Sequence, residues 1–146
     1  MRLSPIIDCF DGLAVSHTLS TSPDAEMARS MPKGAISALG PCEKPLIHSD
    51  CSCRYRWLGW ISVCDEAGLT RSMSKKGYGP DDSAMEGFFG RLKTEMLHGR
   101  DWSGVTIEKF VREMDAYIGW CNAKRIKRSL GSMSPLDYRR NLGLTA

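Results

Sequence analysis

No stretch of this sequence comes near the roughly 18 consecutive apolar residues that a membrane-spanning helix requires. The first residues, MRLSPIIDCFDG, lack the long apolar core of a signal peptide, and no internal repeat is visible. These absences argue against a membrane-spanning or secreted chain. We therefore expect a cytoplasmic protein that does not act at a membrane.

The sequence also lacks a second closely spaced cysteine pair to match Cys51 and Cys53. Zinc sites usually combine two pairs, each with a wider C-x₂-C spacing. A zinc-binding regulatory protein built on His48, Cys51, Cys53 and Cys64 is therefore a disfavoured alternative. We expect the six cysteines to stay reduced and to act as small apolar side chains.

The composition is that of one globular domain with a short extension, since 42% of the 146 residues are apolar and 25% are charged. The charge is unevenly distributed. From Thr70 onward there are 14 Lys and Arg against 9 Asp and Glu, whereas residues 1–69 hold 6 against 8. A basic C-terminal half favours a polyanionic partner, although a solvated basic surface gives the same pattern.

The pattern of apolar and turn residues predicts an α/β domain with a helical C-terminal end. Asp11-Gly12 between two short apolar runs indicates a β-hairpin, and Pro32 is expected to break or kink the first helix. Ser134 followed by Pro135 indicates the start of another helix. The expected elements are strands within 3–12 and 13–20, a helix at 22–40, a buried strand at 44–50, a helix at 53–68, an edge strand at 69–73, and helices at 81–95, 106–125 and 134–142.

Two carboxylates stand where such a domain can build a site. Asp50 ends the predicted strand LIHSD, at the carboxyl edge of a sheet, and Glu86 lies in the first turn of the helix DDSAMEGFFGRLKTE. Each also has a structural interpretation, with Asp50 capping the next helix and Glu86 completing an S-x-x-E capping box with Ser83. Lys93 follows Glu86 by seven residues, which places both on one helix face about 10 Å apart along the axis.

The helix that carries Glu86 also has an apolar face, which we expect to be buried. The next helix has apolar residues at helical spacing as well. The first face comprises Met85, Phe88, Phe89, Leu92 and Met96, and the second comprises Ile107, Phe110, Val111, Met114, Tyr117, Ile118 and Cys121.

Several ordered motifs resemble the integrase core of bacterial insertion-sequence transposases, which are DDE enzymes of the retroviral-integrase superfamily. These motifs are HSD, the thirty-five-residue interval from Asp50 to Glu86, DDSAMEGFFGRLKTE and WCNAKRIKRSLGSMSPLDYRR. The resemblance extends to LSPIIDCFDGLAVS and SPDAEMA, so it covers nearly the whole chain. It implies a ribonuclease-H-like fold, with residues 1–98 as a partial catalytic core and residues 99–146 as its C-terminal helical extension.

The resemblance implies that three carboxylates hold two divalent metal ions, Mg²⁺ or Mn²⁺, with Asp50 as the second carboxylate and Glu86 as the third. Mg²⁺ prefers hard oxygen ligands, and two ions about 4 Å apart stabilise the entering and leaving oxygens of an in-line phosphoryl transfer. The expected activity is DNA cleavage and strand transfer in transposition. Water or a DNA 3′-hydroxyl would be the nucleophile.

The implied partners are transposon-end and target DNA, together with a second copy of the chain or a full-length transposase at the bacterial nucleoid. Basic side chains would contact the DNA phosphates. For several of them, simple solvation at the surface is the alternative. The expected DNA contacts are Lys93, Lys75, Lys76, Lys124, Arg125, Lys127 and Arg128.

The family's first carboxylate lies on a strand upstream of every motif matched here, whereas Met1 stands just before the second strand. We therefore expect this chain to lack the first strand and its aspartate, to bind metal weakly, and to be inactive alone. Asp8 and Asp11 are the acids nearest the start, and we do not expect them to substitute. The alternative is a non-catalytic fragment that binds DNA or assembles with the transposase.

Overall fold

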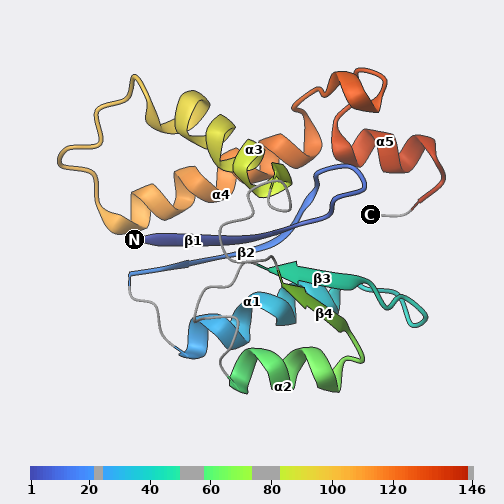
Figure 1. The fold of residues 1–146 in the computed structure, drawn as a ribbon. Coiled ribbons are helices and arrows are strands. Elements are labelled where there is room, and N and C mark those ends of the chain that lie inside the picture. The colour runs from blue at the N-terminus through green and yellow to red at the C-terminus, as the bar shows by residue number, and fades with distance from the viewer. Residues whose placement is uncertain (22–24, 50–57, 74–82, 145–146) are drawn as a thin grey trace. The chain divides into compact units, whose positions relative to one another are not determined.

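The computed structural model describes residues 1–21, 25–49, 58–73 and 83–144. Among these residues, strands and helices mix as far as Met73, and the elements from Ser83 onward are all helical (Figure 1). This confirms the predicted α/β class with a helical C-terminal end. The elements are β1 (Arg2–Ile7), β2 (Ala14–Ser20), α1 (Ala25–Ser37), β3 (Leu46–Ser49), α2 (Leu58–Glu66), β4 (Thr70–Met73), α3 (Ser83–Leu92), the π-helical turn η3 (Lys93–Leu97), α4 (Ile107–Ala123), the 3₁₀ turn η4 (Arg128–Leu130) and α5 (Pro135–Asn141).

The chain forms two compact units. Unit 1 comprises Met1–Ile6 and Val15–Met85, and unit 2 comprises Ile7–Ala14 and Glu86–Ala146. Unit 1 therefore contains most of the strands with α1 and α2, while unit 2 contains the hairpin turn and the C-terminal helices. The division into a core and an extension at residue 98 stays a prediction.

The predicted hairpin is confirmed, because β1 and β2 pair in a two-stranded sheet. Its turn is closed by hydrogen bonds from Asp8 N to Leu13 O at 2.9 Å and from Gly12 N to Asp8 O at 2.7 Å. Gly12 has a φ of +76°, a conformation that side chains disfavour, and a Cβ there would collide with the Lys127 ammonium. A glycine is therefore required at this turn.

The strands β3 and β4 form a second two-stranded sheet and run parallel, with Leu46 opposite Thr70 and Ser49 opposite Met73. The prediction that the first of these strands is buried was wrong. Its side chains alternate, so that Ile47 packs on the core while 60% of Leu46 is exposed. The reason is that the described residues cover only one face of this sheet, and the other face meets solvent.

The core of unit 1 is a cluster of Met31, Trp60, Cys64 and Leu69, contributed by α1, α2 and the residue before β4. Partly buried apolar residues pack against it from both sheets, from α1 and α2, and from the residues that follow these helices. They are Ile6, Ile36, Leu39, Ile47, Ile61 and Ala67.

The helix α1 is not broken at Pro32, contrary to one of the two outcomes expected for that residue. It continues to Ser37, three residues short of the predicted end. Pro32 and Met31 are both buried, and the Ser16 hydroxyl donates to Met31 O at 3.2 Å. Tertiary packing of this face compensates for the backbone hydrogen bond that proline cannot donate.

The helices of unit 2 begin where the sequence predicted. Ser134 caps α5 by accepting from Asp137 N, with Pro135 in the first turn, and Thr106 caps α4 by accepting from Lys109 N. In unit 2, α3 and α4 lie side by side (Figure 1). The buried residues of these helices are Phe88, Leu92, Met96, Met114 and Ile118, all within the apolar faces that the spacing indicated, whereas 55% of Ile107 is exposed.

Candidate functional site and nucleic-acid interface

Glu86 occupies the first turn of α3, and its side chain is exposed. Phe88 and Leu92, four residues apart, are buried on the opposite side of the helix and fix its orientation within unit 2. The exposed carboxylate is therefore a consequence of the apolar pattern of α3. The helix begins at Ser83 itself, the residue that the S-x-x-E spacing predicts as the cap.

Lys93 is exposed at the start of η3, directly after α3. The π-helical turn is defined by the hydrogen bond from His98 N to Lys93 O at 2.8 Å, which spans five residues. The sequence did not predict this wider turn. The shared role of Glu86 and Lys93 stays a prediction.

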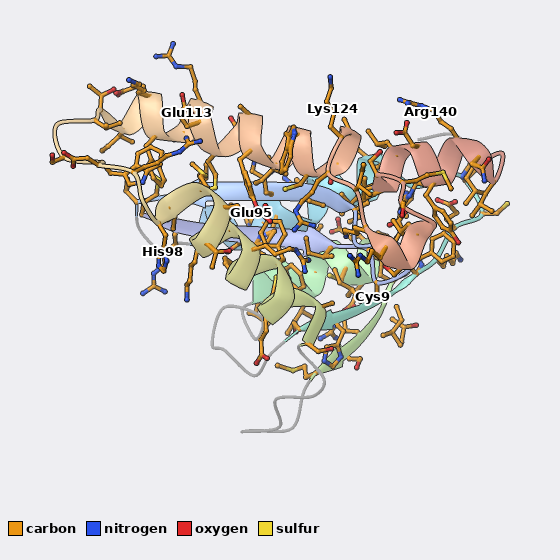
Figure 2. All side chains as sticks on the ribbon, turned by 90° about the horizontal axis from the view of Figure 1, so that it is seen from above. Cys9, Glu95, His98, Glu113, Lys124 and Arg140 are labelled. Carbon is orange, nitrogen blue, oxygen red and sulfur yellow. The ribbon has the colours of Figure 1, made fainter. Side chains whose placement is uncertain are left out.

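Glu95, in the same turn, is the centre of a hydrogen-bonded network that the sequence did not reveal. Arg125 Nη2 and Nε donate to Glu95 Oε1 at 2.5 and 3.0 Å, and the Tyr117 hydroxyl donates to Oε2 at 2.8 Å. Figure 2 shows Glu95 between the α3–η3 segment and α4. The Arg125 hydrogen bond holds the pKa of Glu95 below its ordinary value, and burial raises the pKa of Tyr117. The ion pair in this network links η3 to the residues just after the C-terminal end of α4.

The basic residues after α4 divide into two kinds. Arg125 is engaged with Glu95, and Lys127 donates its ammonium to Asp11 O at 3.0 Å and Gly12 O at 3.2 Å. Burial lowers the pKa of Lys127. Lys124 and Arg128 are exposed, and Figure 2 shows Lys124 projecting from α4 away from α3. Lys124 and Arg128 are thus better placed than Arg125 and Lys127 to meet a polyanion.

Asp8 and Asp11, in the hairpin turn, are bound by Arg139 of α5. The guanidinium donates to both Asp11 oxygens through Nε and Nη2, and Nη2 also reaches Asp8 Oδ2 at 2.8 Å. Asp11 has a fully buried side chain, and its hydrogen bond raises the pKa of Arg139. Both carboxylates are paired with the Arg139 guanidinium, and the expectation that they do not replace a metal ligand stays a prediction.

Asn122 provides a further contact to this turn. Its side-chain amide accepts from Ala14 N and donates to Ala14 O, both at 2.9 Å. Asn122, Lys127 and Arg139 together hold the turn against the C-terminal helices within unit 2. We name these three residues and the turn 8–14 the hairpin clasp.

Several predicted site residues lie outside the described part of the chain. They are Asp50, Lys75 and Lys76, as well as Cys51 and Cys53 of the zinc alternative. Of the other two zinc candidates, Cys64 is fully buried in the apolar core of unit 1, and the His48 ring is hydrogen-bonded to the Ser72 hydroxyl at 2.8 Å. Within residues 1–21, 25–49, 58–73 and 83–144, no group of three or more His, Cys, Asp or Glu is gathered for a metal. The helices of these segments also include none long and apolar enough to cross a membrane.

Comparison with known proteins finds related sequences. The integrase core domain family matches residues 86–142. A probable transposase for insertion sequence element IS1353 from Shigella flexneri is 53% identical over 142 residues, covering 97% of this chain and 28% of that protein. An uncharacterized transposase-like protein from Haemophilus influenzae is 39% identical, covering 95% of this chain and 63% of that protein.

A third relative is InsK from Escherichia coli, assigned as a transposase for insertion sequence element IS150. It is 36% identical, over 95% of this chain and 48% of its own length. The chain thus spans less than two thirds of each of these relatives, and no solved structure was found to match it. The integrase-core match, the transposase relatives and the mixed α/β architecture agree with one another. The chain is therefore related to the integrase core of bacterial insertion-sequence transposases.

Proposed function

We propose that this chain is part of a transposase core that cuts and joins DNA by two-metal phosphoryl transfer. The observation that carries the proposal is the exposed carboxylate of Glu86, at the first residue of the region that matches the integrase core domain. The exposed ammonium of Lys93 follows on the same helical segment. A carboxylate that can bind a metal ion and an ammonium that can bind a phosphate, both on one helical segment, suit this chemistry.

The roles follow from the chemistry of each side chain. Glu86 and Asp50 offer hard oxygen donors of the kind that Mg²⁺ or Mn²⁺ prefers, and the exposure of Glu86 leaves room for a hydrated ion. Ions held there would stabilise the oxygens that enter and leave the phosphorus. Lys93, Lys124 and Arg128 bind phosphates and orient the DNA, with Lys75 and Lys76 as further candidates.

Asp50 and Glu86 are two of the three carboxylates that the resemblance implies, so a peptide limited to residues 1–146 would bind metal weakly and would not cleave DNA. Activity then depends on assembly with a second copy or a full-length transposase on bacterial nucleoid DNA in the cytoplasm. Transposon ends and target DNA are the substrates.

The test compares Glu86→Gln with Glu108→Gln. Both glutamates are exposed in the first turn of a helix, on α3 and α4 respectively, so Glu108 is a matched control. Binding of Mn²⁺ is measured by its paramagnetic effect on the NMR signals of the chain, together with plasmid nicking. We expect weak Mn²⁺ binding that Glu86→Gln abolishes and Glu108→Gln preserves, with no nicking by the chain alone. Equal Mn²⁺ binding by both variants would contradict the proposal.

A second candidate function is a fragment that binds DNA or assembles with the transposase without doing chemistry. The exposure of Lys93, Lys124 and Arg128 favours it, because phosphate binding by these cations needs no metal. Salt-dependent binding to duplex DNA that survives Glu86→Gln, without any specific Mn²⁺ binding, would support this function over the catalytic one.

A further inference from the structure

A cavity of about 370 Å³ lies in unit 2 between η3 and α4. On the α4 side, Glu113, Tyr117 and Trp120 follow one another at intervals of four and three residues, which places them on one helix face. Met96, almost completely buried, lines the cavity from η3, and Arg100 lines it from the segment between η3 and α4. The cavity therefore has an apolar and aromatic interior with charged groups among its lining residues.

Trp120 is left 45% exposed, although it is among the largest apolar side chains of the unit. Its ring lies 6.0 Å from the Tyr117 ring with a 35° angle between the planes, so the two rings form a tilted pair. An exposed indole that lines a cavity offers a flat surface on which another ring can stack. We call Tyr117 and Trp120 the aromatic shelf.

The charges of the cavity already have partners. Glu95 binds Arg125 through both of its oxygens and accepts from the Tyr117 hydroxyl, and Glu113 pairs with Arg100 at 3.5 Å. A lysine or arginine from a partner would therefore find both carboxylates occupied. Since both carboxylates are paired with arginines, they would also repel a polyanionic chain less than unpaired carboxylates would. The ligand that suits the lining residues of this cavity is therefore flat and uncharged.

We propose that the aromatic shelf is a stacking site for an unpaired nucleobase of single-stranded DNA, an inference that rests on the proposed function of the chain as a DNA-acting protein. A base has a flat π-face for Trp120 and an edge that carries both hydrogen-bond donors and acceptors. The single 3.5 Å bond between Arg100 and Glu113 leaves further guanidinium N–H donors and a second carboxylate oxygen for that edge. The exposed Lys93, at the start of η3, is available for the phosphates of the same strand.

The test uses the 146-residue chain with two probes of equal length, about 12 nucleotides, a span that covers one stacking groove. One probe is a single strand that carries a fluorescent base analogue, and the other is a sugar–phosphate chain without bases. Binding is measured at several salt concentrations for the wild type and for Trp120→Ala, Trp120→Phe, Lys93→Ala and Trp102→Phe. Trp102 is the control, because its ring packs against Phe110, 5.0 Å away, and it is not among the residues that line the cavity.

We expect Trp120→Ala to weaken binding of the base-bearing strand about tenfold, without changing the salt slope or the binding of the baseless chain. Trp120→Phe keeps most of the affinity, since it keeps an aromatic face. Lys93→Ala weakens binding of both probes and lowers the salt slope. Trp102→Phe binds like the wild type. Because Trp120 is half exposed, the variants are expected to keep the helical circular-dichroism signal of the wild type, and Trp120→Phe reports on the shelf if Trp120→Ala does not fold.

Three results would overturn the inference. If the wild type binds both probes equally and Trp120→Ala changes neither, the shelf does not stack a base, while salt-dependent binding still supports the proposed function. If Trp120→Ala instead abolishes self-association seen by light scattering, the shelf is a protein interface. If neither probe nor duplex DNA binds, the proposed function fails together with the shelf.

Discussion

Replacing Arg139 by methionine removes the guanidinium of the hairpin clasp while keeping most of the apolar stem. Arg139 makes three hydrogen bonds to Asp8 and Asp11, and its side chain is only 17% exposed, while the Asp11 side chain is fully buried. Without the guanidinium, the Asp11 carboxylate is left with the Leu13 N–H as its remaining donor among the described contacts. A buried charge that loses its partner is costly to keep in the folded state.

Removal of one partner from a buried ion pair costs about 3–5 kcal/mol. The partial exposure of Arg139 and the hydrogen bond from Leu13 N reduce this cost, so we expect about 2–4 kcal/mol. Arg140→Met is the matched control. That neighbour pairs with Asp137 at 3.1 Å, but their side chains are 67% and 52% exposed, and such pairs contribute about 0.5 kcal/mol or less.

The assay is urea unfolding followed by circular dichroism. With a slope of roughly 1.5 kcal/mol per molar urea, Arg139→Met should lower the midpoint by more than about 1 M and Arg140→Met by no more than about a third of that. Adding Asp11→Asn to Arg139→Met should recover part of the loss, because the unpaired charge is then gone. Equal midpoints for Arg139→Met and Arg140→Met would refute the reasoning that burial decides the value of these pairs.

Three further predictions concern local features. The folded-state pKa of Glu95 is lowered by its Arg125 hydrogen bond, so its stabilisation is fully present above the ordinary value of 4.5 and is lost as pH falls through the lower folded value. Glu95→Gln should therefore flatten the acid side of a pH–stability curve, and an unchanged curve would argue against the ion pair. Ser134→Ala should cost about 1 kcal/mol by removing the cap of α5, whereas Ser129→Ala, an exposed change in η4, should cost almost nothing in the same urea assay. A thiol reagent should modify the exposed Cys9 and Cys42 rapidly and Cys64 only on unfolding, because the Cys64 thiol is buried away from the reagent and burial also raises its pKa. Equally fast reaction of all three would show that the core of unit 1 is open.

Local features of this chain could be predicted from sequence because their causes are local. Gly12 is required by a positive φ within its own turn, and Ser134 with Pro135 starts α5 through contacts two or three residues away. The buried face of α3 follows from the spacing of Phe88 and Leu92. Each of these signals is contained in a few neighbouring residues.

The partners of the charged residues could not be predicted in this way. Arg139 and Asp8 are 131 positions apart, and Arg125 and Glu95 are 30 apart, so each pair depends on how unit 2 folds. Arg125 lies in the basic run that was predicted to bind DNA, and the composition of that run does not distinguish a paired arginine from a free one. The sequence did give one signal of these acidic partners, because Glu95 and Asp8 both lie in the motifs that support the resemblance. The exposed face of β3 was missed because a short apolar run does not reveal how many neighbours cover it.

The π-helical turn η3 has a geometric consequence for the apolar residues before it. Phe88, Leu92 and Met96 are spaced by four, and each such step overshoots one full turn of an α-helix, which has 3.6 residues. A stripe of apolar residues with this spacing would wind slowly around a regular α-helix, so its later residues would lose contact with the helix that packs on the earlier ones. The wider turn undershoots instead, because its hydrogen bond from His98 to Lys93 spans five residues, and this returns Met96 to the line of Phe88 and Leu92. The stripe therefore stays straight, so one straight partner helix can cover it along its full length, and a one-residue deletion in η3 would turn Met96 out of register.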